Sequence, residues 1–272
     1  MSICVSVKVG EGLVLAADSA STIEGQIGNN PPGILKTYEH ARKLCQVKDY
    51  PVGVMSWGAG VLGARTMESL VAEFANNRPR LSELDSLSVK VLSDELYDFI
   101  KQRHLEEFPQ APTQPQGPGA LGIYVGGFST DAFFPETYVG LLPIEAELHN
   151  ARPDREEGKP TFGANWYGQT DAIIRWHLGF APELRGALLS QKEWTEPEVR
   201  EFLQGFQYPV LFDGMPLQDA VELAEFLVYL VIQRFRFVVG APLCGGAIEV
   251  AVLTPGRFTW VRRRDLHAGN HR

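Results

Sequence analysis

The chain begins with an alternating pattern of apolar and polar positions. From residue 3 to residue 9, every odd position is Ile or Val, and the even positions are Cys, Ser and Lys. This period of two is typical of a strand with two different faces. The tripeptide GEG at 10–12 favours a tight turn, and a second apolar run follows at 13–17. The pattern therefore predicts a β-hairpin at the start of the chain.

Further along the chain, blocks of strand periodicity alternate with blocks of helical periodicity. Three segments, which are long, polar or rich in Gly and Pro, are interpreted as loops: 24–39, 108–119 and 180–216. The pattern predicts strands over 43–47, 51–56, 121–128, 132–139, 247–253 and 257–261, and helices over 61–74, 91–100, 171–178 and 217–234.

The order of these elements predicts the fold class. Strands, two helices, strands, two helices and strands follow one another, which suits an αββα sandwich: two sheets with helices on both outer sides. Nothing in the composition divides the chain, so we expect a single domain over 1–262. The basic tail, 263–272, is expected to be frayed.

Composition and charge narrow the function classes. The formal net charge of −8 argues against nucleic acids and anionic membranes as partners. No apolar run approaches the roughly 20 residues of a membrane span, and a signal peptide is not evident. The three cysteines are far apart without metal-ligand spacing, which is typical of a reducing compartment. We expect a soluble, cytoplasmic protein that needs no metal and no organic cofactor.

Candidate chemistry lies at the start of the hairpin. Removal of Met1 would make Ser2 the N-terminus, with an amine of pKa near ~8 beside a hydroxyl that this amine can activate. Such a nucleophile also needs a cation, a carboxylate and an oxyanion donor. If Glu11 is the pivot of the hairpin, Cys4 lies opposite Asp18, and Asp18 lies one diagonal step from Ser2. A bulge at the glycines would shift this register by one residue, and a solvated strand-end carboxylate is the alternative for Asp18.

The opening SICVSVKVGEGLVLAADS resembles that of the proteasome β-type peptidases and the bacterial HslV peptidase, and is most similar in style to Anbu. These are N-terminal nucleophile hydrolases with an αββα sandwich. The resemblance implies that Ser2 is the nucleophile and Asp18 the family's aspartate. In ARKLCQV it places the catalytic lysine at Lys43, with Arg42 and Lys36 as alternatives.

Three later segments resemble the same family. MSWGAGVLG resembles the turn that donates an oxyanion-hole amide, which would be Trp57 or, with a shift of one residue, Gly58. NWYGQTDAI implies a supporting turn at Tyr167 and Gly168, where the family has a serine that supports the amine. LCGGAIEV places Cys244 at a second supporting serine.

Other residues replace the supporting side chains of the family: Tyr167 replaces the first serine and Cys244 the second. The family's aspartate just upstream of the second serine corresponds to Ala241, whereas the nucleophile, aspartate and lysine positions are all filled. The resemblance therefore implies a serine-type peptidase that acts through Ser2 on peptides. The alternatives are a catalytically weak assembly subunit and a hydrolase of a small amide or acyl donor. The resemblance also implies a ring or helical homo-oligomer, with no particular partner ATPase indicated.

Overall fold

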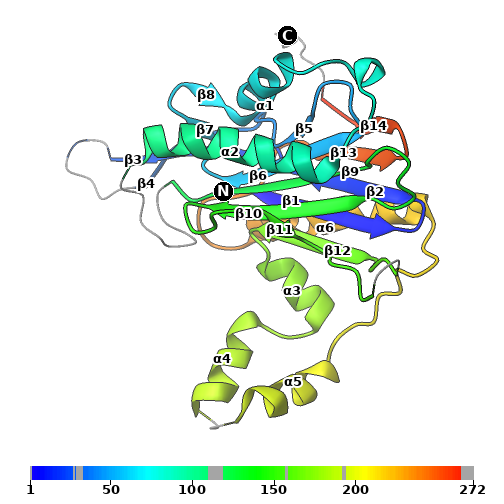
Figure 1. Cartoon of the computed structure of the whole chain (residues 1–272). Coiled ribbons are helices and arrows are strands. Elements are labelled where there is room, and N and C mark those ends of the chain that lie inside the picture. Colours follow the sequence, from blue (N-terminus) through cyan, green and yellow to red (C-terminus); the bar gives the residue numbers. More distant parts are fainter. Residues whose placement is uncertain are drawn as a thin grey trace, which may run out of the picture.

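Two five-stranded antiparallel sheets form the centre of the described molecule (Figure 1). The computed structural model describes residues 2–26, 28, 33–109, 119–156, 159–191 and 194–264. The first sheet has the order β12-β1-β2-β13-β14, and the second has the order β11-β10-β9-β6-β5. Their bounds are β1 (Ile3–Val9), β2 (Gly12–Ala17), β5 (Leu44–Gln46), β6 (Val52–Gly58), β9 (Leu121–Gly127), β10 (Glu136–Leu142), β11 (His149–Asn150), β12 (Gly163–Gly168), β13 (Glu249–Thr254) and β14 (Arg257–Arg262).

Helices accompany both sheets. The second sheet packs against α1 and α2, and the first against α6 and the start of α3, whereas α4 and α5 extend away from the sheets (Figure 1). The helices are α1 (Met67–Asn76), α2 (Val89–Glu107), α3 (Asp171–Leu178), α4 (Pro182–Gln191), α5 (Glu196–Gln204) and α6 (Leu217–Phe237).

Three buried clusters explain why these elements form. The odd positions of β1, predicted to share one face, pack with α6. The even position Cys4 joins a cluster that holds residues of both sheets, including Leu15 of β2 and Tyr124 of β9. A third cluster joins α1 and α2 to the second sheet. Each apolar stripe therefore has a partner, which is the arrangement that its periodicity predicted.

The register of the first hairpin differs from the prediction by one residue. Cys4 lies opposite Ala17 rather than Asp18, because Gly10 and Glu11 form a two-residue turn without a central pivot. Asp18 consequently faces Ile3, whose backbone carbonyl accepts a hydrogen bond from the Asp18 N–H (3.2 Å). The carboxylate is placed beside the N-terminal end of β1 by this pairing.

Two of the predicted loops contain regular structure. The described part of segment 24–39 includes residues of the paired antiparallel strands β3 (Ser21–Gly25) and β4 (Gly33–Tyr38), so its interpretation as a loop was wrong there; residues 27 and 29–32 lie outside the described residues. Segment 180–216 contains α4 and α5. A capping box at Thr195 marks the start of α5. Most of the third predicted loop, 110–118, lies outside the described residues.

Smaller differences concern element ends. The predicted helix over 61–74 begins at Met67, after a short hairpin of β7 (Val61–Leu62) and β8 (Arg65–Thr66). The strand expected over 132–139 is β10, which begins at Glu136 and ends at Leu142. No helix of the described residues is both long and apolar enough to cross a membrane.

We expect Gly53→Ala to lower the free energy of unfolding by about 1–3 kcal/mol, because overpacking a filled core costs this much. A Cβ at Gly53 of β6 would lie 2.5 Å from Leu15 Cδ1 of the facing sheet. The matched control is Gly186→Ala in α4, where a Cβ meets nothing within 4 Å. The control should gain about 0.5–1 kcal/mol from helix propensity. Equal denaturant midpoints for the two variants would contradict the close approach of the sheets.

Candidate active site

Backbone contacts from β12 hold Ser2 at the start of β1. The Gln169 N–H donates to the Ser2 carbonyl (2.8 Å), and Ile3 pairs with Gly168. Gly168 has a φ of +93°, and a Cβ there would lie 2.0 Å from the Ser2 oxygen, so only glycine fits. Ser2 is 5% exposed. Its backbone is therefore fixed although it lies at the edge of the described chain.

The Asp18 carboxylate is fully buried and accepts four hydrogen bonds. Oδ1 accepts from Lys43 Nζ (2.7 Å) and from the Ile3 N–H (2.9 Å). Oδ2 accepts from the N–H groups of Gly245 (3.0 Å) and Ala20 (3.3 Å). These donors come from different parts of the chain, and they replace the water that a buried carboxylate loses. Asp18 is thus a site residue and not a solvated strand end.

Lys43 contacts Asp18 in the structure, whereas the two alternative cations, Arg42 and Lys36, do not. The side chains of Lys43 and Asp18 are 8% and 0% exposed. Arg42 instead pairs with Glu68 (3.3 Å), and Lys36 lies on the exposed β3–β4 hairpin. Lys43 directly precedes β5, so that its position follows from the pairing of this strand with β6.

Ser2 and Lys43 share a hollow of about 40 Å³. The hollow lies where the start of β1 and the end of β6 meet the segment before β5, and the start of β3 also borders it. It is lined by Ser2, Ala20, Ser21, Thr22, Ala41, Arg42, Lys43, Ser56, Trp57, Gly58, Ala59, Gly60 and Met67. A hydroxyl, an ammonium group and backbone amides therefore converge on one small space.

The end of β6 supplies the two candidate oxyanion donors to this hollow. Ser56 donates its N–H to the Lys43 carbonyl (3.0 Å), and Ala59 donates to the Ala120 carbonyl (2.8 Å). Between them, Gly58 has a φ of +89°, and a Cβ there would lie 2.1 Å from the Ala120 oxygen. The glycine in the MSWGAG segment is therefore required by the backbone path.

Tyr167 lies against Trp57. Their rings stack with centroids 4.6 Å apart and planes 15° apart. The ring of Tyr124 packs against the ring of Tyr167 as well. Burial raises the pKa of Tyr167 to about 12, so its hydroxyl stays protonated near neutral pH. The aromatic pair fixes the side chain of Trp57 behind the turn that carries the oxyanion candidates.

Cys244 and Cys4 lie close to the Lys43–Asp18 pair, but neither is a thiolate. Burial raises the pKa of Cys4 to about 12, and burial is likewise the main cause of the raised pKa of Cys244. Cys4 Sγ donates to the Ser56 carbonyl (3.4 Å). Both thiols act as small buried side chains beside the site, which leaves Ser2 as the nucleophile candidate.

The sequence analysis, which relied on side-chain motifs, did not predict the backbone N–H groups that complete the site. Gly245, beside Cys244, donates to Asp18, and Gln169, beside Gly168, donates to Ser2. Glycines in the two motifs were the available signal, because a close approach of backbone to backbone requires them. Ala241, at the place of the family's second aspartate, is exposed. Among the described residues, no group of three or more His, Cys, Asp or Glu side chains could hold a metal ion.

Comparison with known proteins identifies the fold. No family model and no curated protein matches the chain. A mutant of Anbu from Hyphomicrobium sp. strain MC1 matches with a TM-score of 0.54 and 13% identity, over 100% of this chain and 89% of that one. The chain shares the fold of Anbu. Anbu (ancestral beta-subunit) from Yersinia bercovieri gives a TM-score of 0.46 and 13% identity, over 95% and 86% of the two chains.

The buried thiols predict a dependence of stability on pH. Burial raises the pKa of both Cys4 and Cys45 from 9.0 to about 12, so the folded chain holds these protons more tightly than the unfolded chain. Their contribution to stability is complete below pH 9 and is lost as the pH rises towards 12. We expect denaturant midpoints to fall over this window, and less so in Cys4→Ala. A thiol reagent at pH 8 that modified the native and the unfolded chain equally fast would contradict the buried, protonated state.

Proposed function

We propose that the chain is an N-terminal nucleophile amidohydrolase, a proteasome-like serine peptidase that uses Ser2 after removal of Met1. The observation that carries this proposal is the buried Lys43–Asp18 pair (2.7 Å), whose lysine lines the same hollow as Ser2. The Anbu fold supports the proposal, as does the layering of helices against both sheets, which we interpret as the αββα sandwich of such hydrolases.

In the proposed reaction, Ser2 Oγ bonds to the carbonyl carbon of an amide while its proton passes to the free α-amine of Ser2. Collapse of the tetrahedral intermediate breaks the C–N bond, and the proton leaves with the amine product. Water then hydrolyses the ester and restores the hydroxyl. The positive charge of Lys43 favours the unprotonated α-amine, which is the form that accepts the proton. Asp18 is the positioning residue for Lys43.

We assign the oxyanion donor to Gly58 rather than Trp57. Successive N–H groups of an antiparallel strand point to opposite sides. Since the Ser56 N–H points towards Lys43, the N–H of Gly58 is directed to this side and that of Trp57 towards β9. Only a donor on the Lys43 side can reach a carbonyl oxygen bound next to Ser2.

A hydrolase of small amides is the second candidate. It is favoured by the small volume of the hollow beside Ser2, about 40 Å³, which is enough for a small acyl group. Peptides would instead have to bind mainly along the surface of the turns that border the hollow. A panel of acetylated peptide amides and free small amides, compared by kcat/KM, separates the two candidates.

We further propose that the chain forms a cytoplasmic homo-oligomer. Large apolar side chains are exposed on α5 and the segment after it, as at Phe202, Phe206, Tyr208 and Leu211. Exposed apolar side chains that lie close together in this way mark interaction surfaces.

Intact mass spectrometry with a β-lactone tests the nucleophile. We expect loss of Met1 and one covalent adduct per chain, because an activated Ser2 opens the lactone to an ester. Ser2→Ala should form no adduct. The matched control is Ser21→Ala, which removes another hydroxyl of the same hollow and should be labelled like the unmodified sequence. Retained Met1, or equal labelling of both variants, would refute the mechanism.

Light scattering after size-exclusion chromatography tests the assembly. We expect Leu211→Asp to lower the mass, because Leu211 is 76% exposed and a charge there would be buried without a partner in an interface. Phe133→Asp is the control, since Phe133 is 84% exposed and lies between β9 and β10. A monomeric mass for the unmodified chain at all concentrations would contradict the proposed oligomer.

A further inference from the structure

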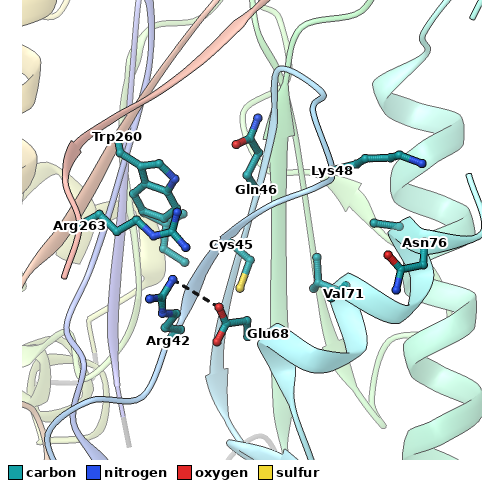
Figure 2. Close-up of a pocket in the computed structure, with 12 residues that line it drawn as sticks. Arg42, Cys45, Gln46, Lys48, Glu68, Val71, Asn76, Trp260 and Arg263 are labelled. Carbon is teal, nitrogen blue, oxygen red and sulfur yellow. Dashed lines mark ion pairs between the residues drawn. The ribbon is translucent and has the colours of Figure 1, made fainter. Parts of the chain in front are cut away.

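A second and larger cavity lies at the edges of the two sheets. It has a volume of about 300 Å³ and is bordered by α1, by the edge strand β5 and by the end of the edge strand β14 (Figure 2). Pockets that bind small molecules start at about this size. The hollow beside Ser2 is separate and much smaller, and the two spaces share one lining residue, Arg42.

The lining of this cavity combines an apolar wall with positive charge. Leu44, Val71, Ala72 and Ala75 supply apolar surface from β5 and α1, and Trp260 supplies an indole ring. Three cationic side chains and a single carboxylate line the same space, namely Arg42, Lys48, Arg263 and Glu68. A lining of this kind disfavours a cationic ligand and favours an anionic one.

The two arginines differ in how their charge is balanced. Arg42 forms an ion pair with Glu68 (3.3 Å). Arg263 packs its guanidinium over the Trp260 ring, 5.1 Å from the centroid, and forms no ion pair with a carboxylate among the described residues. Figure 2 shows both guanidinium groups directed to the same part of the cavity. Glu68 balances the charge of Arg42, whereas the charge of Arg263 has no paired carboxylate among the described residues and leaves a positive field in the cavity.

A buried carboxylate that does not line the cavity interacts electrostatically with both arginines. Glu249 is 2% exposed, and burial raises its pKa, although Arg42 and Arg263 act in the opposite direction. The rise in pKa extends the pH range over which Glu249 is protonated, and this weakens it as a counter-charge. Lys48 donates to the Arg78 carbonyl, a contact that leaves its charge in place.

We propose that this cavity binds a small organic carboxylate with an apolar or aromatic body. The carboxylate would accept paired hydrogen bonds from the Arg263 guanidinium, with Arg42 as the second cation. The body of the ligand would lie against Val71, Ala72 and the Trp260 ring, where it loses contact with water. The site is distinct from the Ser2 hollow, and its occupancy requires no catalysis.

Calorimetric titration with phenylacetate tests the site, with phenylacetamide as the uncharged counterpart. The full chain carries Ser2→Ala in every titration, so that binding is measured whether or not Ser2 is a nucleophile. We expect saturable binding of phenylacetate with a Kd below about 1 mM, which is common for a ligand of this size. The amide should bind at least about tenfold more weakly, because it cannot pair with a guanidinium.

Two substitutions locate the binding. Arg263→Gln should weaken phenylacetate binding at least about tenfold through loss of the charge-assisted pair. Its matched control is Arg262→Gln, since Arg262 is the neighbouring residue but pairs with Glu225 of α6, and its affinity should stay within about twofold. Ala72→Phe keeps all charges and fills the apolar part of the cavity, so it should also reduce binding.

The proposal fails if phenylacetate shows no saturable binding up to about 10 mM, which corresponds to negligible affinity. It also fails if Arg263→Gln and Arg262→Gln bind equally well, or if Ala72→Phe leaves the affinity unchanged. Either of these two results with the variants would place the ligand elsewhere, for example beside Lys43 in the smaller hollow. Thermal unfolding of each variant, measured alongside, shows whether a loss of binding reflects a loss of folding.

Discussion

The ion pair of Lys43 and Asp18 is the constraint on which the candidate site depends. Removing two charges from water is expensive, and their attraction offsets this cost only when other donors complete the geometry. Here the Asp18 carboxylate has three backbone donors besides the lysine. They lie at the start of β1, just after β2 and just before β13. The buried Lys43–Asp18 ion pair is therefore stable only when these three segments are in place, so the site depends on the complete fold.

The same requirement explains why backbone groups carry so much of the site. Tyr167 and Cys244 stand where the resemblance implies supporting hydroxyls, and both side chains have buried, protonated groups. Their neighbours do the positioning instead: the chain at Gly168 and Gln169 fixes the Ser2 carbonyl, and Gly245 binds Asp18. A main-chain N–H is independent of side-chain identity, so a site of this kind tolerates exchange of the flanking residues.

Sequence periodicity correctly predicted the elements whose apolar face packs against one neighbouring layer of the fold. The first hairpin, α6 and the last hairpin follow their predicted ranges closely, because burial dictates their pattern. The β3–β4 hairpin escaped prediction since it is largely exposed and interrupted by Gly and Pro, so no buried face imposes alternation on it. Register was missed by one residue because it depends on the turn geometry at Gly10 and Glu11, which the apolar pattern does not encode.

The choice between adjacent cations shows most clearly what the sequence lacks. Arg42 and Lys43 are both basic, and only the motif distinguishes them in the sequence. In the structure, each is paired with a carboxylate, but the exposed fractions of the side chains are 17% and 49% for Arg42 and Glu68, against 8% and 0% for Lys43 and Asp18. Water and salt screen the first pair and leave its partner exchangeable, whereas the second pair is shielded and fixed. Burial, which the order of residues alone does not reveal, therefore makes Lys43 suitable for a constant field at Ser2, whereas the partner of Arg42 stays half exposed to water.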